Sequence, residues 1–178
     1  MSFSIDPKYF NRVIGLTGVL CLVVIIWGTM QYTHNQQVRF EKGLGDGSEL
    51  SELTFYQINE ADSIEISQYK GSPVILDFWA TWSERSIQAH STLSDFQNEH
   101  PEFVIIAAYV KDNEEYISQY IREQEYDFIY VNGTQVYQDL MVPGVPTQII
   151  FDRVGKLQQV FVGFQDDDQF EQIMSHGR

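Results

Sequence analysis

Hydrophobic residues form one long block near the start of the chain and shorter, periodic runs after it. Residues 13–30 contain no charged side chain and are rich in Val, Ile and Leu. A helix needs about 20 apolar residues to cross the hydrocarbon core of a bilayer. The block therefore predicts one transmembrane helix over residues 13–32, preceded by a short segment of residues 1–12.

A cleaved secretory signal is the alternative interpretation of this block, because Lys8 and Arg12 precede it as a basic region would. No small-x-small cleavage site follows the block, since its exit reads Trp-Gly-Thr-Met-Gln-Tyr over residues 27–32. Cys21 follows a leucine inside the apolar run, which does not fit a lipoprotein signal. The pattern favours an uncleaved anchor, and the two basic residues favour a cytoplasmic N-terminus.

The remainder of the chain is predicted to be a polar linker and one α/β domain. Residues 33–50 are polar and include glycine at 43, 45 and 47, which predicts a flexible linker before a domain over residues 51–178. Short apolar runs typical of strands alternate with helical patterns. Strands are expected at 54–58, 63–66, 74–78, 103–110, 128–131, 148–151 and 157–163, and helices after residue 83, at 114–124 and at about 167–176.

The first of these helices has a clear buried face. Ser86, Ala89, His90, Leu93 and Phe96 recur at helical spacing, so this row is expected to face the sheet. The serine at position 83 is well placed to cap the helix, because its hydroxyl can accept a hydrogen bond from a free amide of the first turn.

The charge of the chain is strongly acidic after the anchor. Of 11 basic and 25 acidic residues, four and two lie before residue 43, which leaves 7 and 23 and a net charge of −16 in the remainder. Nucleic acid and anionic lipid would be repelled by such a domain. An acidic surface that keeps the domain soluble is the simpler interpretation, because it explains the charge without a dedicated docking face.

Two short segments carry the most specific chemistry. Trp79-Ala80-Thr81-Trp82-Ser83-Glu84-Arg85-Ser86 follows the third predicted strand, and Gly144-Val145-Pro146-Thr147 precedes the sixth. These segments and the order of elements resemble the thioredoxin superfamily, most closely the membrane-anchored thiol-disulfide proteins of the TlpA and ResA type. The resemblance covers about residues 50–175. It implies an α/β fold with a thioredoxin-like central mixed sheet flanked by helices.

The resemblance also assigns roles to single residues. Ser83 occupies the position of the nucleophilic cysteine, and Ser86 that of the resolving cysteine. Pro146 matches a proline with a cis peptide bond, and Asp77 matches a buried acid used for proton transfer. A thiolate attacks a disulfide, whereas a serine hydroxyl stays protonated and cannot form a sulfur–sulfur bond. No catalytic residue is therefore expected to be active.

The neighbours of the two serines differ from the family as well. Glu84-Arg85 replaces the common Gly-Pro pair, and Ser91 stands where a proline is usual. Replacement of two cysteines in the laboratory would leave these neighbours untouched, so natural loss of the redox role is favoured. The sequence alone leaves both origins open.

Other kinds of site find little support. A serine hydrolase built from Ser83 and His90 would need the two side chains in contact, yet seven residues span about 10 Å along a helix, and no GxSxG segment is present. The four histidines show no metal-ligand spacing, and a copper chaperone would need two cysteines. We expect neither a metal nor a cofactor.

The leading hypothesis is a redox-inactive domain of a cytoplasmic (inner) membrane protein that binds other proteins as an accessory or assembly subunit of a membrane complex. Its partners would be integral membrane proteins, held through the transmembrane helix and a groove. The groove would comprise Trp79, Trp82, Ser83, Glu84, Arg85, Val145, Pro146 and Thr147. Five of the ten tyrosines, which lie within residues 116–137, are expected to be mostly core or rim packing, with a second possible contact region there.

Two alternatives stay open at this stage. The first is a thiol-disulfide oxidoreductase, serving cytochrome c maturation or periplasmic disulfide reduction, that is seen here with its cysteines replaced. The second is a folding or holding factor for unfolded chains. The oxidoreductase predicts cysteine codons at positions 83 and 86 of the gene, whereas the leading hypothesis predicts serine codons. The folding factor predicts many different bound proteins, whereas the leading hypothesis predicts one partner.

Overall fold

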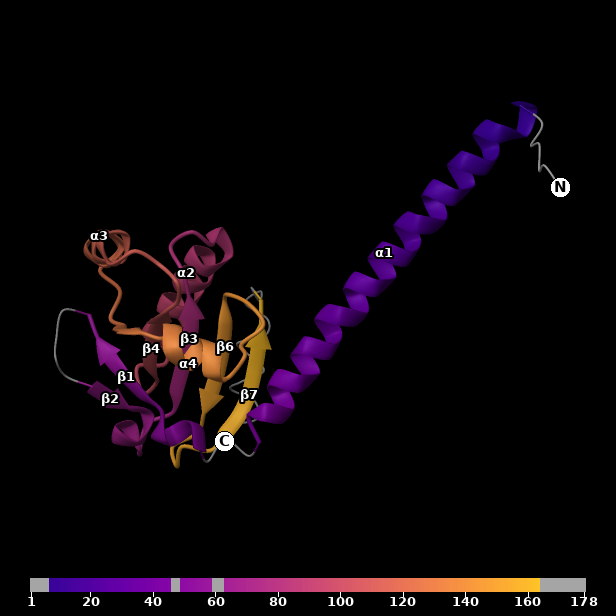
Figure 1. The fold of residues 1–178 in the computed structure, drawn as a ribbon. Helices are drawn as coiled ribbons and strands as arrows, with labels where there is room; N and C mark the ends of the chain where they lie inside the picture. The colour runs from indigo at the N-terminus through magenta and orange to yellow at the C-terminus, as the bar shows by residue number, and fades with distance from the viewer. Residues whose placement is uncertain (1–6, 46–48, 59–62, 164–178) are drawn as a thin grey trace. The chain divides into compact units, whose positions relative to one another are not determined.

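The computed structural model describes residues 7–45, 49–58 and 63–163 (Figure 1). The chain divides into two compact units between residues 38 and 39. The first unit consists of most of helix α1 (Pro7–Gly43). An apolar window of 18 residues within this helix has a mean hydropathy of 2.4, and none of that window is buried. A helix long and apolar enough to span a membrane therefore lies where the sequence predicts it.

Helix α1 extends further than the sequence analysis expects. The polar segment after residue 32 was predicted to be a flexible linker, but the helix continues to Gly43. The physical reason lies at its end, where Phe40 and Leu44 are 1% and 4% exposed and belong to the core of the second unit, together with Leu50. An i, i+4 pair of apolar residues on one helical face is buried there, which outweighs the flexibility that nearby glycines allow.

The second unit contains one mixed seven-stranded sheet with the strand order β2-β1-β5-β4-β3-β6-β7. The strands are β1 (Thr54–Gln57), β2 (Ser63–Glu65), β3 (Val74–Trp79), β4 (Val104–Tyr109), β5 (Ile129–Asn132), β6 (Thr147–Phe151) and β7 (Leu157–Val162). Strands β3, β4 and β5 are parallel, whereas β6 runs antiparallel to both β3 and β7. The predicted thioredoxin-like α/β fold is confirmed.

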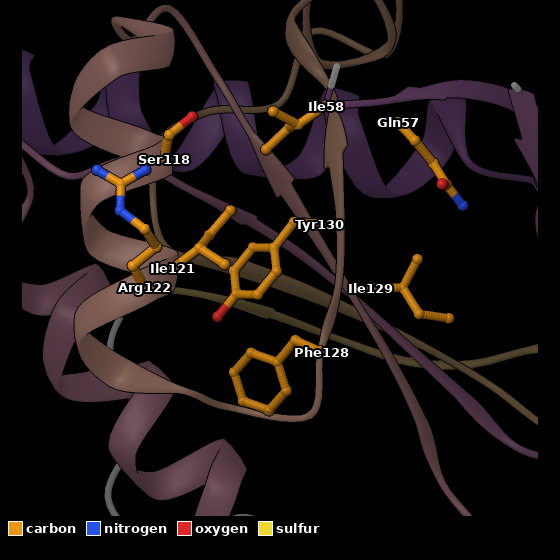
Figure 2. Close-up of a pocket in the computed structure, with 8 residues that line it drawn as sticks. All are labelled: Gln57, Ile58, Ser118, Ile121, Arg122, Phe128, Ile129 and Tyr130. Carbon is orange, nitrogen blue, oxygen red and sulfur yellow. The ribbon is translucent and has the colours of Figure 1, made fainter. Parts of the chain in front are cut away.

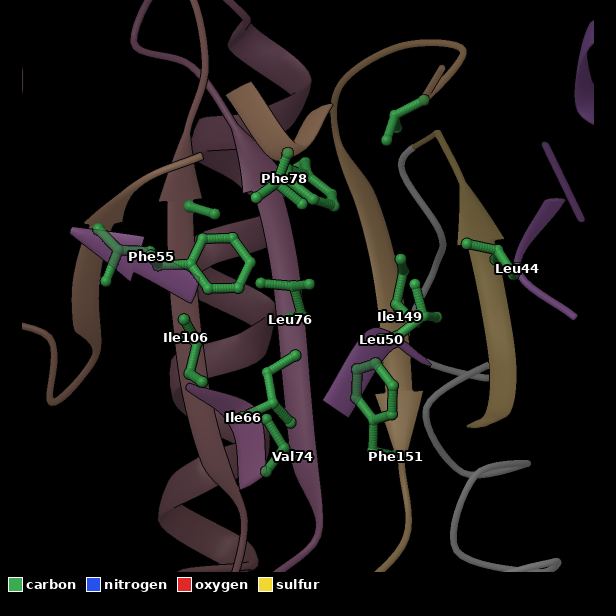
Figure 3. Close-up of a cluster of buried hydrophobic side chains, with 14 of the residues drawn as sticks. Leu44, Leu50, Phe55, Ile66, Val74, Leu76, Phe78, Ile106, Ile149 and Phe151 are labelled. Atoms are coloured by element: carbon green, nitrogen blue, oxygen red, sulfur yellow. The ribbon is translucent and has the colours of Figure 1, made fainter. Parts of the chain in front are cut away.

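Two hydrophobic cores lie on the opposite faces of this sheet. Odd-numbered residues of β3 and β4, such as Ile75 and Ile105, pack with helices α2 (Glu84–Glu99) and α3 (Glu114–Gln124). Even-numbered residues, such as Leu76 and Ile106, pack with the end of α1 and other elements on the second face (Figure 3). All six residues of β3 are buried, as expected for a central strand covered on both faces.

The helical predictions hold with one omission. The buried residues of α2 are the five that form the predicted row, and α3 spans the predicted residues, with Asn113 capping its first turn. Helix α4 (Thr134–Asp139), a short helix after Gly133, is not predicted from the sequence. A side chain at Gly133 would place its Cβ 2.7 Å from that of Ala108, so glycine permits the close approach. The helix predicted at 167–176 lies outside the described residues.

Candidate functional site

The serine-containing segment begins where β3 ends. Trp79 and Ala80 are fully buried, and the backbone N–H and Oγ1 of Thr81 both donate to Oδ2 of Asp112 in the loop after β4. Trp82 follows with 63% of its surface exposed. The loop is thus anchored on one side and presents a large aromatic side chain to solvent.

Ser83 is the N-cap of α2. Its backbone is extended, and its Oγ accepts a hydrogen bond from the backbone N–H of Ser86 at 3.2 Å. This satisfies one of the amide groups that the first turn of a helix leaves free. The predicted capping role is confirmed. Glu84 and Arg85 are exposed beside it, whereas the side chain of Ser86 is fully buried and makes no hydrogen bond within the described part of the chain.

The proline loop lies beside this segment. Phe78 near the end of β3 pairs with Thr147 at the start of β6, so the residues just before Thr147 adjoin the start of the serine segment. The Val145–Pro146 peptide bond is cis, as predicted. Val145 is half-buried, and the hydroxyl of Thr147 donates to the carbonyl oxygen of Gly144 at 2.8 Å.

Three residues of the expected groove are buried, namely Trp79, Pro146 and Thr147. Trp79 is 0% exposed and its ring lies against that of His90, tilted by 50° with centroids 4.3 Å apart, because odd-numbered positions of β3 face α2 and α3. Thr147 is also 0% exposed. The side chains that remain accessible around the two segments are therefore those of Trp82, Ser83, Glu84, Arg85 and Val145.

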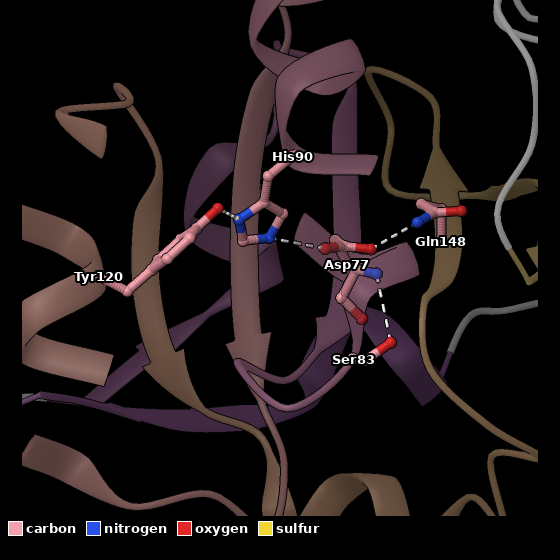
Figure 4. Close-up of polar contacts among 6 residues, drawn as sticks. Asp77, Ser83, His90, Tyr120 and Gln148 are labelled. Carbon is pink, nitrogen blue, oxygen red and sulfur yellow. Dashed lines mark hydrogen bonds and ion pairs between the residues drawn. The ribbon is translucent and has the colours of Figure 1, made fainter. Parts of the chain in front are cut away.

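A buried polar network runs beneath the two serines (Figure 4). Oδ2 of Asp77 lies 3.0 Å from Nε2 of His90, and Oδ1 accepts a hydrogen bond from the side-chain amide of Gln148 at 2.6 Å. Nδ1 of His90 lies 3.0 Å from the hydroxyl of Tyr120. Asp77, His90 and Gln148 are at most 1% exposed and Tyr120 is 8% exposed, so the network links four elements in the interior.

Aromatic rings enclose this network. Besides Trp79, the rings of Phe128 and Tyr120 lie 5.3 Å and 5.6 Å from that of His90. Burial raises the pKa of the Tyr120 and Tyr130 hydroxyls, and the nearby Tyr126 raises both further. These hydroxyls therefore stay protonated at neutral pH. The tyrosine-rich stretch thus supplies core packing around His90, as expected, while Tyr116 remains exposed.

The geometry does not bring Ser83 and His90 together as a serine hydrolase would need. A hydrolase needs its histidine to accept the proton of the serine hydroxyl. Both nitrogens of His90 face other groups, and Ser83 uses its hydroxyl to cap α2. Among the described residues, no group of three or more His, Cys, Asp or Glu side chains is arranged to hold a metal ion.

The amino-acid sequence identifies the family to which the chain belongs. Residues 61–178, about two thirds of the chain, match the family described as a thioredoxin-like domain. The chain belongs to the thioredoxin-like family.

Two relatives match this thioredoxin-like chain over most of its length. The Thioredoxin-like protein YneN of Bacillus subtilis (strain 168) is 24% identical over 162 residues, which is 88% of this chain and 94% of that protein. The Thiol-disulfide oxidoreductase ResA of the same organism is 24% identical over 174 residues, which is 94% of each. The thioredoxin-like domain is thus similar to proteins of the thiol-disulfide oxidoreductase type.

Solved structures show the same fold. A putative Thiol:disulfide interchange protein DsbE from Chlorobium tepidum has a TM-score of 0.62 at 23% identity, covering 70% of this chain and 94% of that one. StoA from Bacillus subtilis has a TM-score of 0.57 at 17% identity, covering 70% of this chain and 98% of that one. In the thioredoxin-like chain described here, the single cysteine is Cys21, in the apolar part of α1.

Sequence reasoning did not foresee the network between Asp77 and His90. The two residues were predicted separately, Asp77 as a buried acid and His90 as part of the helical row that faces the sheet. One signal was present, because His90 belongs to the row of α2 that faces the sheet. Two further features decide which polar groups meet across that interface. These are the alternating direction of the side chains along β3 and the register between β3 and β6, which places Asp77 opposite Gln148.

A hollow of about 420 Å³ lies apart from the serine segment, between α3 and the strands β1 and β5 (Figure 2). Its lining combines apolar and polar side chains, with Arg122 as the one charged residue among them. The lining residues are Gln57, Ile58, Ser118, Ile121, Arg122, Phe128, Ile129 and Tyr130. None of the expected groove residues contributes to it.

Replacing Ser83 with alanine is expected to lower the free energy of unfolding by about 1 kcal/mol, because the first turn of α2 loses its side-chain cap. Urea unfolding of the full chain in mild detergent measures this loss. Ser83→Asn retains a side-chain oxygen that can cap and should stay close to the unaltered protein. Equal losses in the two variants would contradict the capping role.

Proposed function

We propose that the protein is a single-pass membrane protein whose extracytoplasmic thioredoxin-like domain does not exchange disulfides and instead binds other proteins. It would act as an accessory or assembly subunit of a membrane complex. The observation that carries this proposal is that the loop, the helix cap and the cis-proline of the site are all in place while both sulfur positions hold serine. The surface that would bind another protein remains, whereas the sulfur atoms needed for disulfide exchange are absent.

The accessible part of the site has the composition of a protein contact. Trp82 is 63% exposed although it is a large aromatic residue, and such residues are enriched where proteins bind one another. Val145 and the exposed Glu84-Arg85 pair lie on the two segments that meet there. We assign the accessible surface of the partner-binding groove to Trp82, Ser83, Glu84, Arg85 and Val145, with the buried Pro146 fixing the backbone beside it.

The membrane helix supports the same proposal. One helix of the described part of the chain is long and apolar enough to cross a membrane, and basic residues precede its apolar stretch. We infer that the N-terminus is cytoplasmic and that the domain lies on the outer side of the inner membrane. A second contact through this helix would raise the effective concentration of a partner in the plane of the membrane.

An insulin-reduction assay tests the redox part of the proposal. The full chain in mild detergent, supplied with dithiothreitol, should not accelerate insulin reduction above the dithiothreitol background, because neither position 83 nor 86 can form a mixed disulfide. An active thioredoxin run in parallel shows that the assay responds. Turnover by the serine-containing chain would contradict the proposal.

Affinity purification from solubilised membranes tests the binding part. The unaltered chain should retain a partner in stoichiometric amount, and Trp82→Ala should lose it. Tyr56→Ala is the matched control, since Tyr56 is 62% exposed but lies on β1, which is separated from β3 by two strands. Equal retention by both variants would contradict the assigned groove, and a heterogeneous set of clients would indicate a folding factor instead.

The similarity to ResA supports a second candidate function. Since that relative is named a thiol-disulfide oxidoreductase, the chain would be an oxidoreductase seen with its cysteines replaced. Reading the encoding gene at codons 83 and 86 separates the two functions. Cysteine codons would support the oxidoreductase, and serine codons would contradict it.

A further inference from the structure

The loop that follows β4 is hydrogen-bonded to three other elements. The backbone N–H of Val110 donates to the carbonyl oxygen of Trp79, at the end of β3, at 2.9 Å. The backbone N–H of Lys111 donates to the hydroxyl of Thr134, the first residue of α4, at 3.1 Å. The side chain of Asn113 caps α3. The loop therefore has a fixed place in the domain.

The remaining residue of this loop, Asp112, binds the serine-containing segment. Its Oδ2 accepts hydrogen bonds from the backbone N–H of Thr81 at 2.5 Å and from the Thr81 hydroxyl at 2.8 Å. Its Oδ1 accepts from the backbone N–H of Asn113 at 2.8 Å, which fixes the direction of the carboxylate. Hydrogen bonds to a carboxylate are stronger than those between neutral groups. One carboxylate thus holds both donors of Thr81.

Thr81 and Trp82 form a turn between the buried end of β3 and helix α2. Ala80 before them is 0% exposed, whereas Trp82 is 63% exposed. The backbone N–H of Ser83 donates to the carbonyl oxygen of Ala80 at 3.2 Å and closes the turn from within. Among the hydrogen bonds of the described residues, those to Asp112 are the ones that tie Thr81 and Trp82 to another element. The position of the exposed indole therefore depends on them.

We propose that Asp112 is a positioning residue for partner binding, which fixes the backbone that presents the Trp82 indole. It acts through Thr81 and needs no contact of its own with the partner. A binding loop that is already ordered loses less conformational freedom when the partner binds, which raises the affinity. The inference rests on the proposed function and names a residue outside the assigned groove that prepares the groove for binding.

Hydrogen exchange of the full chain in mild detergent, resolved to single residues by mass spectrometry, tests the first step. In Asp112→Ala the amide of Thr81 should exchange at least about tenfold faster, because it loses a hydrogen bond to a charged acceptor. The amides of β3 should keep their rates. Opening confined to the turn is the expected result, whereas general destabilisation of the domain would speed exchange in β3 as well.

Two substitutions of Thr81 provide matched variants. Thr81→Val keeps the backbone N–H and the shape of the side chain but removes the hydroxyl that donates to Asp112, whereas Thr81→Ser retains that hydroxyl. Protection of the amide at position 81, relative to its rate in the unfolded chain, should be lower with valine than with serine. Glu102→Ala removes an exposed acid just before β4 and controls for the loss of one negative charge. Its protection should equal that of the unaltered chain.

Affinity purification from solubilised membranes tests the second step. Retention of the partner should fall in Asp112→Ala and in Thr81→Val, and it should match the unaltered chain in Thr81→Ser and Glu102→Ala. Faster exchange at position 81 with full retention of the partner would overturn the inference, because the held turn would then not be needed for binding.

Unchanged exchange at Thr81 in Asp112→Ala, or equal acceleration in the turn and in β3, would also overturn the inference. If Asp112→Ala does not fold, the comparison of Thr81→Val with Thr81→Ser decides, and equal protection in these two would overturn it. An unaltered chain that retains no partner, or a Trp82→Ala variant that keeps it, would instead contradict the proposed function. The exchange measurement needs no partner, so the two failures are distinguishable.

Discussion

Replacing Asp77 with alanine is expected to lower the free energy of unfolding by about 3–5 kcal/mol, among the largest effects of any single change in this domain. The substitution leaves the His90 ring and the Gln148 amide buried without the carboxylate to which both are hydrogen-bonded. Because all three side chains are at most 1% exposed, water cannot replace the missing partner without disturbing the core. Urea unfolding in mild detergent, followed by tryptophan fluorescence, measures the loss.

Asp77→Asn is the control for this prediction. An asparagine fills the same space, can accept from Gln148 and can donate to Nε2 of a neutral His90, so it should cost clearly less than alanine. If alanine were tolerated as well as asparagine, the network would have no part in holding β3, α2 and β6 together.

Phe40→Ala is expected to cost about 3–5 kcal/mol in the free energy of unfolding of the domain, as truncation of a buried phenylalanine usually does. Phe40 is 1% exposed and packs in the same core as Leu76 and Ile106, although it lies on the helix that begins in the apolar anchor. The measurement is again urea unfolding of the full chain in detergent.

Lys42→Ala provides the comparison, since Lys42 is exposed and lies on the same end of the helix. Its effect should stay within about 0.5 kcal/mol. Similar small effects in both variants would mean that the end of α1 does not belong to the domain core.

The parts of the fold that were predictable are those with a strong local signal. One row of residues recurs with the period of a helix that has a single buried face, and α2 buries all five of them: Ser86, Ala89, His90, Leu93 and Phe96. The continuous apolar run of β3 predicted a strand covered on both faces for the same reason. The cis-proline followed from the resemblance to a family and not from the local pattern, which carries no signal for it.

What could not be predicted depends on contacts between distant segments. Glycines at 43, 45 and 47 indicated flexibility, and the spacing of Phe40 and Leu44 was a weaker signal for a helix. The weaker signal decided the structure because both side chains pack into the core of the domain. Helix α4 has only six residues, which is too short for a periodic pattern. The pairing of Asp77 with His90 required the relative placement of two elements, which neither segment specifies alone.

The burial of Phe40, Leu44 and Leu50 has a practical consequence for anyone who expresses the domain without its anchor. Cutting the gene at the domain boundary predicted from the polar linker, near residue 51, removes three side chains from the hydrophobic core and exposes the residues around them to water. Such a fragment should aggregate or require detergent, whereas one that starts a turn before Phe40 should be monodisperse, and size-exclusion chromatography of the two lengths distinguishes these outcomes.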